Sequence, residues 1–138
     1  MEHLSRGQIS GLVALSTLYW GAAAAEVRYG GHIFFASDLR RLGSFLATAP
    51  IGYIGIRAAE KLLSISPKER LATAALLTAP ALLLDGAALM FFPTVYENPE
   101  LTSKNAPLAV ATSRMGAAWI LFGVGTCFGI ALLARCSH

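Results

Sequence analysis

The chain has 138 residues, of which 55% are hydrophobic and 14% are charged. A soluble domain usually has about 25% charged residues, so this composition is typical of an integral membrane protein and excludes an ordinary soluble domain. The net charge is only +3, and the Lys and Arg residues lie mainly between apolar runs, which excludes a nucleic-acid-binding protein with a basic stripe.

Four apolar segments predict four membrane crossings. They cover about residues 9–35, 42–63, 70–92 and 108–134. Each has the roughly 20 residues that an α-helix needs to cross the hydrocarbon, and none alternates as a membrane strand would. The links between them are short, which favours antiparallel neighbours. The sequence therefore predicts an all-α fold, with residues 1–138 forming a single transmembrane domain built as an up-down-up-down four-helix bundle.

The first segment ends in AAAAEVRYGG, which places Glu26 and Arg28 at the end of an apolar run. Charged side chains near a bilayer usually face the protein interior, a water-filled cavity or one another. One interpretation is a functional site in a polar cavity. The favoured one is an interfacial pair, because the helix already has about 20 residues near position 28.

His32 is the one histidine near the membrane segments, since His3 and His138 are terminal. It leaves one cofactor hypothesis, a single axial ligand for haem or a chlorophyll-type pigment, and no other cofactor is expected. No Cys/His cluster supports a metal site, and no nucleophile with a base or phosphate-binding Gly loop is evident. The sequence therefore predicts no metal ligands, no catalytic residues and no enzyme.

The second link, SISPKER, predicts the start of the third helix. Ser66 is suited to the N-cap, Pro67 to the first turn and Glu69 to the third position. Before this link, Arg57 and the neighbouring Glu60 and Lys61 are interpreted as a charged cluster at a helix end.

Asp85 lies deep in the third segment, within ALLLDGAAL. One hypothesis is a proton-titrating or cation-binding carboxylate. The favoured hypothesis is a buried ion pair or helix–helix hydrogen bond, with Arg28 or Arg114 as its partner. The following stretch, residues 93–107, predicts a solvated loop with room for a short helical turn, and Tyr96 in it fits an interfacial aromatic belt.

Glycines in the fourth segment predict a helix-packing seam. Small residues let helix backbones approach closely in lipid, and Gly123, Gly125 and Gly129 lie in GVGTCFG. The seam is expected either inside the bundle, which we favour, or against a partner.

The distribution of Lys and Arg predicts the orientation. Cytoplasmic loops carry an excess of these residues. The basic side holds Arg6, Arg57, Lys61, Lys68, Arg70 and Arg135, against Arg28, Arg40, Arg41 and Lys104 on the other. Both termini are therefore expected in the cytoplasm, and a bacterial inner membrane is the expected location.

Two family resemblances bear on the fold. The stretches VRYGGHIFF, FLATAPIGYIGIR and APALLLDGAALMFFPTVYENPE resemble a family of small bacterial four-helix membrane proteins of unknown function. That resemblance implies a fold and no activity. A glutamate in the first of four short helices also resembles the small multidrug resistance exporters, whose helix-one carboxylate exchanges protons for cationic drugs. Only Glu26 matches that role, and the later motifs of the exporters do not occur here.

Three functional hypotheses follow. The first is a non-enzymatic accessory or stabilising subunit in the lipid bilayer, docking on a larger membrane protein or on copies of itself. The second is a small proton-coupled transporter that uses Asp85 and Glu26. The third is a pigment- or haem-binding subunit that uses His32.

Overall fold

The computed structural model describes residues 4–136, with side chains described as far as residue 134. His3 and His138 lie outside the described residues, as does the side chain of Arg135. Within this range the chain is helical and has no strand, so the predicted all-α class is confirmed. Its elements are α1 (Arg6–Phe34), α2 (Asp38–Leu62), a 3-10 turn (Pro67–Glu69), α3 (Arg70–Phe91), α4 (Pro99–Lys104) and α5 (Ala106–Cys136).

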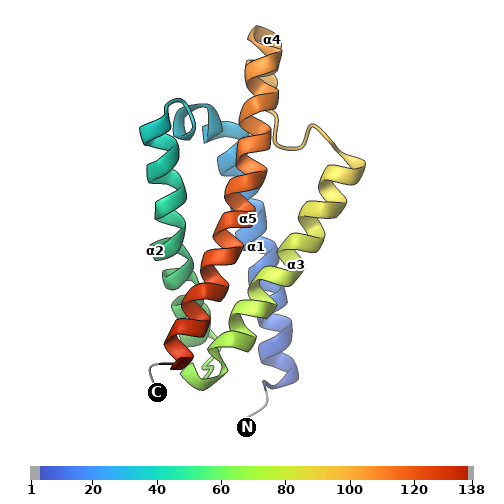
Figure 1. Cartoon of the computed structure of the whole chain (residues 1–138). Helices are drawn as coiled ribbons and strands as arrows, with labels where there is room; N and C mark the ends of the chain where they lie inside the picture. The colour runs from blue at the N-terminus through green and yellow to red at the C-terminus, as the bar shows by residue number, and fades with distance from the viewer. Residues whose placement is uncertain (1–3, 137–138) are drawn as a thin grey trace.

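The four long helices α1, α2, α3 and α5 lie lengthwise beside one another (Figure 1). Helix α1 packs mainly on α3, α2 packs mainly on α5, and α3 also packs on α5. Helix α4 follows the loop after α3 and packs on α5 at one end of the molecule (Figure 1). The predicted segments correspond to these four helices, although α1 and α2 begin three or four residues before the predicted boundaries.

Local side-chain chemistry sets the helix starts. Ser5 and Gln8 form a capping box at the start of α1. Ser37 caps α2, and Asn98 caps α4 with Pro99 in its first turn. The predicted start at Ser66 is confirmed, because its hydroxyl caps the 3-10 turn that leads into α3.

The main apolar core lies toward the end of the molecule where α1 begins. It draws on α1, α2, α3, α5 and the link after α2, through Leu12, Ile56, Ala59, Ile65, Ala74, Leu77 and Ala131. Nearer the other end, helix approach depends on glycine. A Cβ on Gly116 would lie 2.1 Å from a methyl carbon of Val27, and one on Gly31 would lie 2.8 Å from Thr112. Glycine at these positions lets α1 and α5 come together.

Large apolar side chains are exposed on all four long helices, among them Leu18, Ile54, Leu83 and Leu133. Polar side chains are buried instead, including Ser16, Thr48, Thr73 and Thr112. Two helical stretches, Pro67–Phe91 and Ala106–Ala134, are long and apolar enough to cross a membrane. Helices α1 and α2 have a lower mean hydropathy than these two stretches, because polar and charged residues interrupt their apolar runs. Two of the four predicted crossings are thus supported by length and composition.

Candidate functional site

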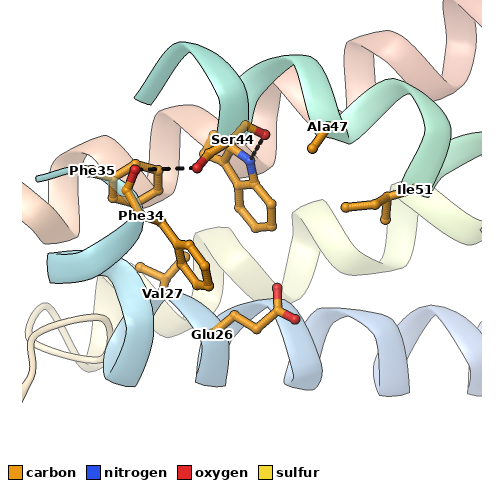
Figure 2. A pocket seen from close by; sticks show the side chains of 8 residues that line it. Glu26, Val27, Phe34, Phe35, Ser44, Ala47 and Ile51 are labelled. Atoms are coloured by element: carbon orange, nitrogen blue, oxygen red, sulfur yellow. Dashed lines mark hydrogen bonds between the residues drawn. The ribbon is translucent and has the colours of Figure 1, made fainter. Parts of the chain in front are cut away.

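A cleft of about 180 Å³ opens between α1, α2 and α5 (Figure 2). Most of its wall is aromatic or aliphatic, and one carboxylate belongs to it. The lining residues are Glu26, Val27, Phe34, Phe35, Ser44, Ala47, Ile51 and Trp119.

Hydrogen bonds around Ser44 hold the walls of the cleft together. The Ser44 hydroxyl donates to the carbonyl of Phe34, at 3.3 Å, and to that of Arg40, at 2.9 Å. The indole N–H of Trp119 donates to the carbonyl of Ser44, at 2.9 Å. The dashed lines in Figure 2 mark the bonds that join Ser44 to Phe34 and to the indole. These bonds therefore fix α2 to α5 and to the C-terminal end of α1 at this cleft.

Glu26 is exposed, and its carboxylate points into the cleft (Figure 2). Within residues 4–136 this carboxylate has no hydrogen bond and no ion pair. Glu26 and Arg28 do not contact each other, as expected for helical positions two residues apart, and the guanidinium of Arg28 donates instead to the carbonyl of Val95, at 2.7 Å, and to that of Thr94, at 3.4 Å. An unpaired carboxylate beside apolar walls suits a ligand that joins a positive charge to an apolar body.

Asp85 does not line the cleft, and it is only 6% exposed. The indole N–H of Trp20 donates to its Oδ1, at 3.0 Å, and the hydroxyl of Tyr96 donates to the same oxygen. The predicted partners Arg28 and Arg114 were wrong. Arg28 is engaged with the loop backbone, and Arg114 lies on the exposed face of α5. This geometry fits the hypothesis of a buried helix–helix hydrogen bond better than that of a proton-titrating or cation-binding carboxylate.

Tyr96 was expected in an interfacial belt but is only 1% exposed. Because its hydroxyl reaches Asp85 while Arg28 holds Thr94 and Val95, the loop after α3 is fixed to both α1 and α3.

Sequence reasoning missed a buried ionic group at the other end of the molecule. Glu60 is 3% exposed, and Arg70 reaches both of its carboxylate oxygens, with Nε 2.7 Å from Oε1 and Nη2 3.1 Å from Oε2. The Nη1 of Arg57 lies 2.7 Å from Oε2. The spacing of Arg57 and Glu60 was a visible signal. The contribution of Arg70 was hidden, because the chain reverses between α2 and α3.

The remaining predicted residues do not join the cleft. His32 lies exposed near the end of α1. Gly123 is in ordinary contact with Thr48 of α2, but no atom lies within 4 Å of a Cβ built at Gly125 or Gly129. The internal seam predicted for those two positions was therefore wrong, because they point away from the neighbouring helices. Gly116, Gly31 and Gly52 make the tight approaches instead, each with a neighbouring side chain under 3 Å from a built Cβ.

No family model, curated protein or solved structure matches this chain. No group of three or more His, Cys, Asp or Glu side chains that could hold a metal ion occurs within the described part of the chain.

Proposed function

We propose that the chain is an integral membrane protein in which all four long helices cross the bilayer as an up-down-up-down bundle. The observation that carries this proposal is the inverted surface, with large apolar side chains exposed on every long helix and polar ones buried. In water such a surface would be costly, whereas in lipid it is the expected one. The excess of Lys and Arg near the start of α1 and the α2–α3 link supports cytoplasmic termini, with a bacterial inner membrane as the proposed location.

Extraction and labelling test this topology. The protein is expected to stay in the membrane fraction after washing at alkaline pH and to leave it only with detergent. Single cysteines placed at Ser64 and at Thr94, in a background without the native cysteines, should react with an impermeant thiol reagent from opposite sides. Release by the alkaline wash, or labelling of both positions from one side, would overturn the proposal.

Within the membrane, we propose that the protein is a non-enzymatic accessory subunit that docks through α5 on a larger membrane protein. Only 11% of the most apolar stretch of α5 is buried inside the protein, although this helix is one of the two candidate membrane spans. Gly125 and Gly129 lie four residues apart on this helix, and each faces open space. Glycines with this spacing share a helix face and allow close approach of another transmembrane helix.

Substitution of these glycines tests the docking surface. Gly125→Leu and Gly129→Leu should convert a larger assembly, measured on native gels in mild detergent, into the single chain. Gly86→Leu on α3 is the matched control, because Gly86 also faces open space. If the native protein always migrates as a single chain, the accessory role fails. If the assembly contains only copies of this chain, it is a homo-oligomer.

A second candidate function, proton-coupled transport of a lipophilic cation, is favoured by the unpaired carboxylate of Glu26 in the cleft. Asp85 does not line this cleft, so only one of the two proposed coupling carboxylates lies in it. In proteoliposomes, Glu26→Gln should abolish uptake of tetraphenylphosphonium driven by a proton gradient, while Asp85→Asn should retain it. Equal uptake by wild type and Glu26→Gln would remove this candidate.

Pigment or haem binding through His32 stays a prediction. Visible absorbance of the purified protein that His32→Ala removes would support it, and colourless protein from pigment-replete cells would contradict it.

A further inference from the structure

A second hollow, of about 390 Å³, lies at the link between α2 and α3. It is lined by Arg57, Glu60, Lys61, Ser64, Ile65 and Pro67. The side-chain amide of Gln8 on α1 donates to the carbonyls of Leu63, at 3.2 Å, and Ser64, at 3.3 Å. The hollow is therefore part of the packed end of the molecule.

Positive charge is in excess around this hollow. The single carboxylate, Glu60, is held at both oxygens by Arg70, which lies behind it with a side chain 14% exposed. Arg57 uses one N–H on Glu60, but its side chain is 46% exposed, so other donors of its guanidinium face outward. Lys61 is exposed and makes no ion pair within residues 4–136. The exposed hydroxyl of Ser64 is a further donor.

Carboxylates balance part of the positive charge at the opposite end of the molecule. There Arg41 pairs with Asp38, at 3.3 Å, and Lys104 pairs with Glu100, at 2.7 Å. Two of the cations at that end are thus paired with neighbouring carboxylates, while Arg40 is exposed and makes no ion pair within the described residues.

We propose that this hollow binds the phosphate of an anionic phospholipid headgroup, through Arg57 and Lys61 with Ser64 as an additional donor. This proposal depends on the membrane insertion proposed above. The candidate span Pro67–Phe91 begins at a residue that itself lines the hollow, which places the cations at the depth of lipid headgroups. Leu62, beside Lys61, is 70% exposed and offers an apolar contact for an acyl chain. Basic pockets between transmembrane helices on the cytoplasmic side are suited to such headgroups.

Native mass spectrometry of the full chain in non-ionic detergent tests the proposal. The protein is titrated with phosphatidylglycerol, with phosphatidylcholine as the zwitterionic control and with inorganic phosphate as a separate arm. We expect phosphatidylglycerol to bind more tightly than phosphatidylcholine, and Lys61→Gln to weaken its binding about five-fold, which corresponds to the loss of one interfacial cation. Lys61→Arg should restore binding. Lys104→Gln removes the same charge at the other end and should leave binding unchanged.

Each outcome decides the proposal. If Lys104→Gln weakens binding as much as Lys61→Gln does, the attraction is a general effect of net charge and the site is wrong. If inorganic phosphate alone binds and displaces the lipid, the assignment to lipid is wrong. Arg57 is left unsubstituted in this test because it also binds Glu60, so the Lys61 variants decide the result. Failure of membrane insertion is recognised separately, by release in the alkaline wash.

Discussion

Tyr96 donates its hydroxyl hydrogen bond to Asp85 across the loop that follows α3, and Trp20 of α1 donates to the same oxygen. The carboxylate is therefore the acceptor that joins a loop and two helices. Buried polar groups are costly when they lack partners and stabilising when they are satisfied. This arrangement assigns Asp85 a structural role that does not depend on a counter-charge.

Two substitutions of Asp85 show whether the fold needs its hydrogen-bond acceptor oxygen or its negative charge. Asp85→Asn keeps a carbonyl oxygen for both donors, so we expect the melting temperature in detergent to change little. Asp85→Leu leaves the indole of Trp20 and the hydroxyl of Tyr96 without an acceptor, at a cost of about 1–3 kcal/mol for each donor. Thermal unfolding followed by circular dichroism measures the difference. Equal destabilisation by Asn and Leu would show that the negative charge itself is required.

The ionic group around Glu60 predicts unequal costs for its members. Glu60→Ala removes the one carboxylate between two guanidinium groups and leaves Arg70, only 14% exposed, without compensation. The expected loss is about 3–5 kcal/mol, as for other broken buried pairs. Arg57→Ala should cost at most about 1 kcal/mol, because that side chain is half-exposed and the pair of Glu60 with Arg70 remains.

Unfolding in increasing dodecyl sulfate measures both variants against wild type. Lys61→Ala is the control, since Lys61 lies next to Glu60 but makes no ion pair within the described residues. If Arg57→Ala proves as destabilising as Glu60→Ala, then Arg57 and not Arg70 is the principal partner of Glu60.

Much of the helical framework was accessible from the sequence, because long apolar runs and local capping signals suffice to define helices. The start at Ser66 and Pro67 is an example, since all its determinants lie within a few residues. The partners of Asp85 were inaccessible, because Trp20 lies 65 residues away and Tyr96 resembled a residue of the membrane interface. A carboxylate in an apolar segment predicts a positively charged partner, whereas the donors to Asp85 are the indole N–H of Trp20 and the hydroxyl of Tyr96.

The candidate site was predicted less well than the helices, because it depends on contacts between residues that are distant in the sequence. Glu26 was found because a carboxylate in an apolar run is conspicuous, but its orientation depends on how α1, α2 and α5 pack. The direction of the glycines in α5 also depends on packing, so Gly123 contacts another helix while Gly125 does not.

Gly116 and Gly125 provide a matched test of that packing. A Cβ at Gly116 would lie 2.1 Å from Val27, which is 2% exposed and has little room to move. Gly116→Ala should therefore destabilise the fold by about 1–3 kcal/mol, as overpacking does. Gly125→Ala meets open space and should change stability by less than about 0.5 kcal/mol. Adding Val27→Ala to Gly116→Ala should recover part of the loss in thermal unfolding, and failure to recover any would place the strain elsewhere.

Glu100 provides a pH-dependent test outside the four long helices. In α4 its Oε1 lies 2.7 Å from the Nζ of Lys104, and this ion pair holds the pKa of Glu100 below its ordinary value of 4.5. Because the folded-state pKa is lower than the unfolded one, the pair stabilises α4 above about pH 4.5, and that contribution is lost as the pH falls through the folded-state pKa. A carbon-13 NMR titration of the Glu100 carboxyl should show the lowered pKa, which Lys104→Ala should return toward 4.5 and Lys104→Arg should preserve. An unchanged titration in Lys104→Ala would show that another group lowers this pKa, and His32, which also favours the charged carboxylate, would then be substituted next.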